Sequence, residues 1–111
     1  MSWRNPSGRA GRGEERKLQR ECEGWLRQLI AWGAVRAYYH RPDQKPRRSE
    51  ERGLPDLVIA LPARVVGVEL KAEGGKVSEE QAIWLESLGA SGAICTSLSE
   101  FQSKLKAWGA G

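Results

Sequence analysis

Histidine, methionine and phenylalanine each occur once in this 111-residue chain, and cysteine occurs twice. The single histidine, His40, argues against a Ser-His-Asp hydrolase and against nucleases whose chemistry depends on histidine. Neither Cys22 nor Cys95 has a Cys or His partner at the spacing of zinc ligands. We therefore expect both cysteines to be small buried hydrophobic residues.

Long apolar runs are also missing. No stretch approaches the roughly 20 residues that a membrane-spanning helix needs. No positively charged segment is followed by an apolar one, so we expect no signal peptide and a cytoplasmic protein without a membrane partner. The length suits one domain with one modest core. The formal net charge of +4 favours a polyanionic partner but does not establish one.

The first 13 residues are rich in Gly, Arg and Ser and show no periodicity. This composition predicts a disordered basic arm over residues 1–13, ahead of a folded domain over residues 14–111. Arg4, Arg9 and Arg12 could follow a nucleic-acid backbone, or the arm could simply be solvated.

A first helix is predicted over residues 14–32, where apolar residues recur at spacings of three and four. They are Leu18, Cys22, Trp25, Leu26 and Leu29. Glu14 and Glu15 suit its first turn because negative charge complements the helix dipole. Glu15 also continues the apolar stripe, so we expect its side chain to point towards the sheet. Gly33 is a natural end for this helix.

The rest of the chain predicts three strands, a helix, a strand and a last helix. They cover residues 35–41, 56–61, 64–72, 78–88, 92–96 and the segment after Ser97. Ser78 with Gln81, and Ser97 with Glu100, match capping boxes at the two helix starts. A strand–helix–strand unit usually makes a parallel pair, so we predict an α/β fold with a four-stranded mixed sheet and helices on both faces.

The central hairpin brings charged residues together. A turn symmetric about Pro62–Ala63 places Asp56 opposite Glu69, and Lys71 shares the face of Glu69 because side chains alternate. Opposed carboxylates destabilise a sheet, and a divalent cation would offset the repulsion. Mg²⁺ and Mn²⁺ prefer such oxygen ligands, and the Leu70 carbonyl is a candidate third one. Lys71 could then stabilise charge on a phosphodiester.

Basic residues flank this acidic pair. The polar stretch from residue 42 to 52 carries Lys45, Arg47 and Arg48, and Lys76 follows a Gly pair on the other side. Loops on a rigid scaffold often carry binding residues, so we predict that these four contact phosphates. The alternative is a solvated loop whose charges face water.

The motif around these residues resembles that of a nuclease family. Its elements are Gly53-x-Pro55-Asp56, Glu69-x-Lys71 and Gly75-Lys76-x-Ser78-x-x-Gln81. The pattern is similar to the VRR-NUC branch of the PD-(D/E)XK nuclease superfamily, from Glu15 to the C-terminus. This resemblance implies a restriction-endonuclease-like αβββαβ(α) core and catalysis that depends on Mg²⁺ or Mn²⁺.

The resemblance also implies roles for single residues. Asp56, Glu69 and Lys71 correspond to the catalytic residues of the family. A family glutamate precedes a hydrophobic-Gln pair as Glu15 precedes Leu18-Gln19, with Glu14 and Glu21 as alternatives. The family also has an active-site glutamine at the position of Gln81, whose capping role would explain it equally well.

The resemblance favours an endonuclease that hydrolyses DNA at Holliday junctions, flaps or nicks in repair, recombination or phage replication. Cutting both strands of a junction needs two active sites, which a homodimer would supply most simply. No small-molecule organic cofactor is implied. The alternatives are a non-catalytic DNA-binding module with a relic site and a small metal-binding protein.

Overall fold

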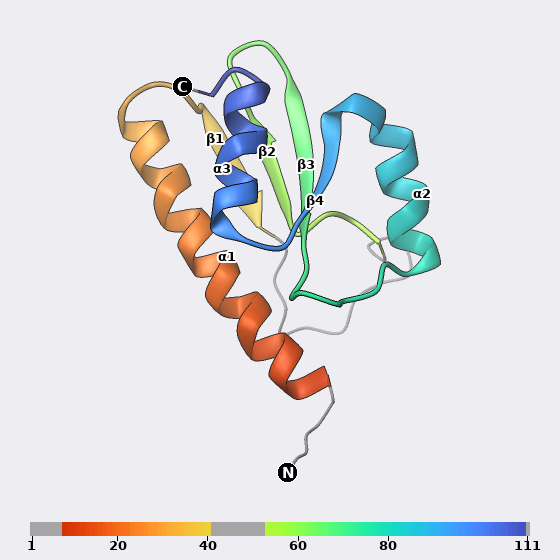
Figure 1. The fold of residues 1–111 in the computed structure, drawn as a ribbon. Coiled ribbons are helices and arrows are strands. Elements are labelled where there is room, and N and C mark those ends of the chain that lie inside the picture. The colour runs from red at the N-terminus through yellow and green to blue at the C-terminus, as the bar shows by residue number, and fades with distance from the viewer. Residues whose placement is uncertain (1–7, 41–52, 111) are drawn as a thin grey trace.

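A computed structural model describes residues 8–40 and 53–110, with side chains from Gly13 onward in the first segment. The elements are α1 (Gly8–Ala31), β1 (Ala37–His40), β2 (Leu57–Ala60), β3 (Val65–Leu70), α2 (Glu79–Leu88), a short 3-10 turn η2 (Gly89–Ser91), β4 (Gly92–Cys95) and α3 (Leu98–Ala107) (Figure 1). Their order confirms the predicted α/β arrangement. None of the helices in these two segments has the length and apolar composition of a membrane span.

The four strands form one mixed sheet in the order β1-β2-β3-β4. The first two pairs are antiparallel, and β3 pairs with β4 in parallel after the crossover through α2. Helices α1 and α3 pack on one face of the sheet and α2 on the other, beside β3 and β4 (Figure 1). The fold is therefore consistent with a restriction-endonuclease-like core.

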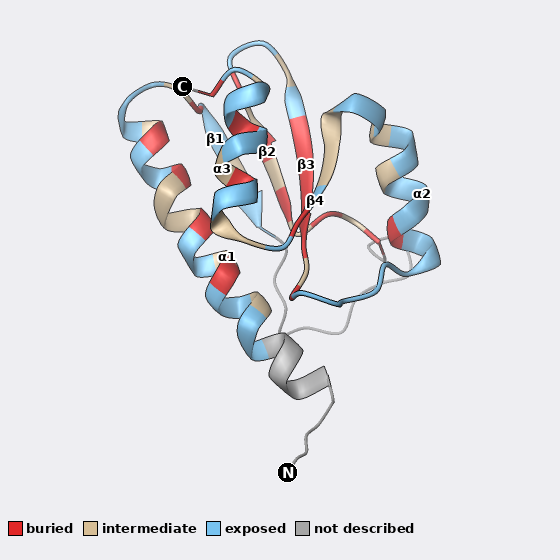
Figure 2. Ribbon diagram, in the orientation of Figure 1, coloured by how far each residue is buried: buried red, intermediate tan, exposed pale blue. Residues whose placement is uncertain are grey.

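The main core lies between the sheet and the α1–α3 layer, as the buried segments of Figure 2 show. From α1 it includes Leu18, Cys22, Leu26 and Leu29. Fully burying one such aliphatic side chain contributes about 1.5–3 kcal/mol. Both cysteines are buried, as expected. Burial raises the pKa of Cys22 to about 12 and that of Cys95 to about 11, so both thiols stay protonated at neutral pH.

The start of α1 differs from the prediction. The helix begins at Gly8, so residues 8–13, assigned above to a disordered arm, have helical backbone, and Glu14 and Glu15 are not in its first turn. Three of these six residues are glycines, which are poor helix formers, so the segment forms as an extension of a helix that packing has already nucleated. Residues 1–7, with Arg4, lie outside the described residues.

The end of α1 agrees with the prediction. Gly33 has a φ of 84°, and its N–H donates to the carbonyl of Ile30 at 3.0 Å. The N–H of Ala34 donates to the carbonyl of Leu29 at 2.9 Å. These two bonds form the usual glycine-terminated end of a helix and satisfy carbonyls that would otherwise lack partners.

The β2–β3 hairpin has the predicted register. Leu57 pairs with Val68 and Ala60 with Val65, so the turn is symmetric about Pro62–Ala63. Both strands are shorter than predicted, because β2 begins one residue after Asp56 and β3 ends at Leu70. The reason is local: the Leu70 N–H donates to the Asp56 side chain rather than to a backbone carbonyl.

Candidate active site

Two carboxylates lie at the end of the β2–β3 hairpin that is remote from its turn. Oδ2 of Asp56 accepts a hydrogen bond from the Leu70 N–H at 2.8 Å. Glu69, the residue before Leu70, is only 2% exposed. A buried carboxylate is costly unless hydrogen bonds or opposite charges compensate for the lost hydration, so the neighbours of Glu69 determine what this site can do.

Gln81 is one of those neighbours, and its amide has two partners. Its Nε2 donates to Oε2 of Glu69 at 2.7 Å, while its Oε1 accepts from the Ser78 N–H at 2.9 Å. The Ser78 hydroxyl completes the capping box by accepting from the Gln81 N–H at 3.1 Å. Helix capping and contact with the candidate site are therefore both roles of Gln81, because one side chain caps α2 and binds the buried carboxylate.

Lys71 is the second neighbour of Glu69. Its Nζ lies 3.7 Å from the same oxygen, Oε2, and its side chain is 14% exposed. The Lys71 N–H donates to the carbonyl of Cys95, which holds this residue beside β4 just after β3 ends. The ammonium is thus oriented towards the acidic pair while it retains contact with solvent.

Small and rigid residues bring Asp56 to this place. Gly53 has a φ of 82°, and a β-carbon there would collide with the backbone carbonyl of Glu80 in the first turn of α2. Pro55 is buried, and a β-carbon at Gly67 would lie 2.9 Å from its Cγ. These close approaches explain why the motif begins with glycine and proline, although Gly67 was not recognised from the sequence.

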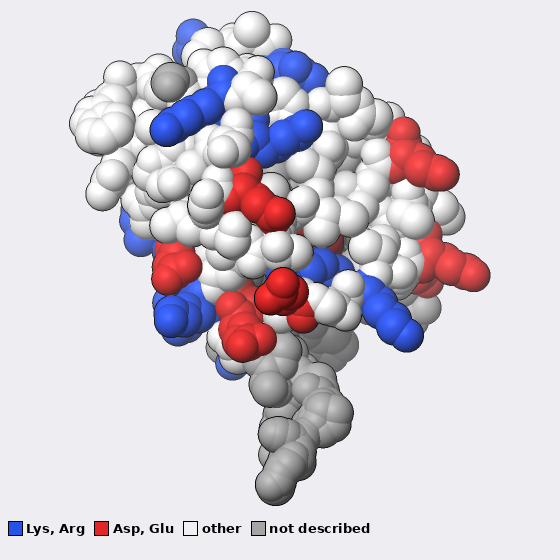
Figure 3. All heavy atoms as spheres, in the orientation of Figure 1, with Lys and Arg blue, Asp and Glu red and all other residues white. Residues whose placement is uncertain are grey.

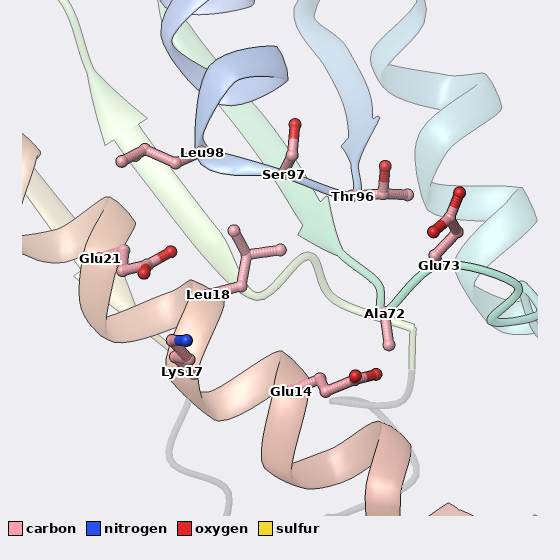
Figure 4. A pocket seen from close by; sticks show the side chains of 9 residues that line it. All are labelled: Glu14, Lys17, Leu18, Glu21, Ala72, Glu73, Thr96, Ser97 and Leu98. Carbon is pink, nitrogen blue, oxygen red and sulfur yellow. The ribbon is translucent and has the colours of Figure 1, made fainter.

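The structure distinguishes the three candidate glutamates of α1. Oε2 of Glu15 accepts a hydrogen bond from the Ala72 N–H at 3.3 Å, so Glu15 reaches the segment that follows β3. Glu14 and Glu21 instead line a hollow of about 330 Å³ beside the start of α3, together with Glu73 (Figure 4). Of the three, Glu15 is the one with a hydrogen bond to the backbone that carries Glu69 and Lys71.

A polar row along α1 was not predicted. Gln19 Nε2 donates to Glu23 Oε2 at 2.9 Å, the Tyr38 hydroxyl donates to Glu23 Oε1 at 2.9 Å, and Arg27 donates to Tyr38 at 3.2 Å. Burial and the bond to Glu23 raise the pKa of Tyr38. The signal was available in the four-residue spacing of Glu15, Gln19, Glu23 and Arg27, which places them on one side of a helix.

Of the four residues that were predicted to contact phosphates, the structure describes Lys76. Lys45, Arg47 and Arg48 lie outside the described residues. Lys76 is exposed between the turn at Gly75, whose N–H donates to the Ala72 carbonyl at 2.8 Å, and the start of α2. Figure 3 shows that acidic and basic side chains are interspersed on the face viewed there.

The donor set suits a hard divalent cation. Within the described segments, no cluster of three or more His, Cys, Asp or Glu side chains could hold a metal. Asp56 and Glu69 supply two carboxylates, and Mg²⁺ is commonly held by one or two carboxylates with water and substrate oxygens. The N–H and C=O of one strand residue point to the same side, so the Leu70 carbonyl faces Asp56 as its N–H does.

A family model for the VRR-NUC domain matches residues 13–98. The chain belongs to the VRR-NUC domain family. The match includes Glu15, Asp56, Glu69, Lys71 and Gln81, and membership in this family implies a nuclease whose substrate is DNA. VRR-NUC nucleases are typically metal-dependent. Comparison with curated proteins and with solved structures gave no match.

Proposed function

We propose that this VRR-NUC domain is a Mg²⁺- or Mn²⁺-dependent endonuclease that hydrolyses phosphodiester bonds in branched or nicked DNA. The observation that carries the proposal is the grouping of Asp56, Glu69 and Lys71 at one end of the hairpin, with Lys71 Nζ 3.7 Å from Glu69. This combination of oxygen donors and an ammonium is that of the PD-(D/E)XK nucleases.

Asp56, Glu69 and the Leu70 carbonyl would hold the cation. When bound there, the cation supplies a water nucleophile near neutral pH and offsets charge on the phosphate. Two side chains of the protein then position the carboxylate and stabilise the charge on the phosphate. Gln81 holds the Glu69 carboxylate in place through the 2.7 Å bond. Lys71 presents a positive charge where negative charge accumulates on the phosphate during hydrolysis.

Burial strengthens these electrostatic effects. Glu69 is almost inaccessible to water and the Lys71 side chain is 14% exposed, so their charges interact in surroundings less polar than bulk solvent. Glu15, hydrogen-bonded to Ala72, is a further acidic residue of the proposed site at the end of the same strand. Lys45, Arg47, Arg48 and Lys76 are proposed to contact phosphates of the DNA.

Recognition of DNA structure fits this domain better than recognition of sequence. A 12.3 kDa domain offers little surface for contacts with base edges, and phosphate contacts carry no sequence information by themselves. Junctions, flaps and nicks arise in repair, recombination and phage replication. Cleavage of both strands of a junction would use two copies of the site, related by the two-fold axis of a homodimer.

The direct test compares four DNA substrates: a supercoiled plasmid, a four-way junction, a flap and a linear duplex. Each is incubated with the protein in Mg²⁺, Mn²⁺, Ca²⁺ or EDTA. We expect cleavage of the branched substrates in Mg²⁺ or Mn²⁺, with binding alone in Ca²⁺. Undiminished cleavage in EDTA would refute the metal role, and binding without cleavage in every metal would identify a DNA-binding module. A solution mass, measured with and without the junction, tests the homodimer.

A further inference from the structure

The two tyrosines of β1 have different surroundings. Successive residues of a strand point to opposite faces. Tyr38 faces α1, where its hydroxyl donates to Glu23 at 2.9 Å, and it packs against the core. Tyr39 therefore points to the opposite face, and it is 57% exposed. Burial and hydrogen bonding explain Tyr38, but neither explains a large aromatic ring at position 39.

The strand register places Tyr39 on the face of the sheet that carries Glu69. Tyr39 pairs with Val58, and Val58 pairs with Gly67, so these three residues share a face. A β-carbon at Gly67 would lie 2.8 Å from Leu88 Cδ1, so this face is the one that α2 covers. Glu69 is two residues beyond Gly67 in β3 and therefore belongs to the same face.

Tyr39 is also close to Asp56. Asp56 is two residues before Val58, the partner of Tyr39, which makes it the diagonal neighbour of Tyr39 across the β1–β2 pair. Such diagonal neighbours are about 7–8 Å apart, with their Cβ atoms somewhat closer, and an aromatic side chain can bridge that gap.

In the part of the chain that the structure describes, no helix covers the face around Tyr39. Helix α2 lies over β3 and β4, and β1 is largely in the exposed colour in Figure 2. Val65, on the same face at the start of β3, is 58% exposed. Among the described residues, no helix lies in the way of a ligand that extends from the carboxylates across β1 and β2.

We propose that Tyr39 stacks on an unpaired nucleobase next to the scissile phosphate and so selects DNA that contains unstacked bases. This inference rests on the nuclease function proposed above. A tyrosine ring can stack on any base, so the contact would not read sequence. In an intact duplex both faces of each base are covered by their neighbours. A flap or a junction offers a free base, and its stacking on Tyr39 would favour cleavage there.

Three variants separate the contribution of the Tyr39 ring to DNA binding from that of its hydroxyl and from changes elsewhere in β1. Tyr39→Leu removes the ring but keeps an apolar side chain, and Tyr39→Phe keeps the ring without the hydroxyl. Tyr38→Phe is the matched control, because it removes the neighbouring hydroxyl from the opposite face. Because Tyr39 is more than half exposed, we expect its two variants to unfold at nearly the wild-type temperature.

The first measurement compares the affinity in Ca²⁺ for two DNAs, a flap and a fully paired duplex. The flap carries 2-aminopurine at the unpaired position next to the junction. We expect the wild type and Tyr39→Phe to quench the 2-aminopurine fluorescence. Tyr39→Leu should lose the quenching and about 5- to 100-fold of the flap affinity, with unchanged affinity for the duplex. Equal flap affinity and quenching for the two Tyr39 variants would overturn the proposal, as would an equal loss of affinity for both DNAs.

Single-turnover cleavage in Mg²⁺ or Mn²⁺ is the second measurement. Tyr39→Leu should slow flap cleavage at subsaturating protein, while Tyr38→Phe should cleave at the wild-type rate. A wild type that binds but does not cleave would refute the proposed nuclease function, yet the difference in binding between the Tyr39 variants would still test stacking. The two hypotheses can therefore fail separately.

Discussion

The amide of Gln81 joins the first turn of α2 to the buried carboxylate of Glu69. Nε2 donates to Glu69 Oε2 at 2.7 Å, and Oε1 accepts from the Ser78 N–H at 2.9 Å. A hydrogen bond to a charged group typically contributes about 1.5–3 kcal/mol. The position of the helix start and the orientation of a candidate metal ligand are thus linked through one side chain.

Replacing Gln81 with Glu should separate these two functions. A glutamate can still complete the capping box, but its carboxylate would lie against that of Glu69. We expect Gln81→Glu to lower the free energy of unfolding in EDTA by about 1.5–3 kcal/mol and to slow cleavage strongly. Ser78→Ala should cost about 1 kcal/mol by removing a cap and should leave cleavage near the wild-type rate. If Gln81→Glu keeps the wild-type stability and cleaves normally, Gln81 only caps the helix. Thermal unfolding and single-turnover cleavage provide both readouts.

The acidic pair should be indispensable for cleavage. Asp56→Asn and Glu69→Gln should each slow it by at least about 10²-fold, because each removes a ligand charge from the metal that generates the nucleophile. Both should keep the fold, because each amide has nearly the shape of the carboxylate that it replaces. Glu86→Gln, on the exposed side of α2, is the control. Near wild-type turnover by either site variant would refute the assignment.

Lys71 distinguishes an enzyme from a binding module. Lys71→Arg keeps the positive charge but replaces a compact ammonium with a planar fork. We expect it to bind DNA in Ca²⁺ about as tightly as the wild type and to cleave far more slowly in Mg²⁺. Lys76→Arg, at an exposed position, should bind and cleave normally. Full cleavage by Lys71→Arg would count against a specific chemical role for this ammonium.

Four basic residues are predicted to act through phosphate contacts. Alanine at Lys45, Arg47, Arg48 or Lys76 should weaken binding equally for all sequences. Each true contact that is lost should reduce the slope of log K against log salt concentration by about one. Lys106→Ala, on the last turn of α3, should leave the slope unchanged. An unaltered slope in the quadruple variant would mean that these side chains are merely solvated.

The buried thiols should be unreactive in the folded protein. Burial raises the pKa of Cys22 from 9.0 to about 12 and that of Cys95 from 9.0 to about 11, and it is the thiolate that reacts. Iodoacetamide at pH 8 should therefore label both cysteines only after unfolding. Because the thiols ionise more readily when unfolded, their contribution to stability is complete below pH 9 and is lost as the pH rises towards 11–12. This loss should be smaller in Cys22→Ala. Rapid labelling of the folded chain would contradict the burial of these groups.

Several features of the site follow from the sequence alone, because they depend on residues close together in the chain. Pro62–Ala63 determines the hairpin register, and the register aligns Asp56 with Glu69. Ser78 and Gln81 form their capping box within one helical turn. The chemical roles proposed for these residues came from the resemblance to VRR-NUC nucleases, and the family model confirmed the family.

Other features depend on how distant segments pack. Glu15, rather than Glu14 or Glu21, meets the backbone of Ala72, and this depends on how α1 is rotated against the sheet. By contrast, one local detail was predicted wrongly: Glu100 was expected to complete a second capping box with Ser97, but its carboxylate accepts from the N–H and hydroxyl of Thr96, four residues earlier.

The sequence by itself determined the order of the elements, the hairpin register and the likeness to a nuclease family, because turns, caps and apolar periodicity are local properties of a chain. Only the tertiary structure decided that Gln81 meets Glu69 and that Gly53 lies against Glu80. Those contacts join α2 to segments 12 or more residues away, and side-chain spacing cannot specify the angle at which a helix crosses a sheet.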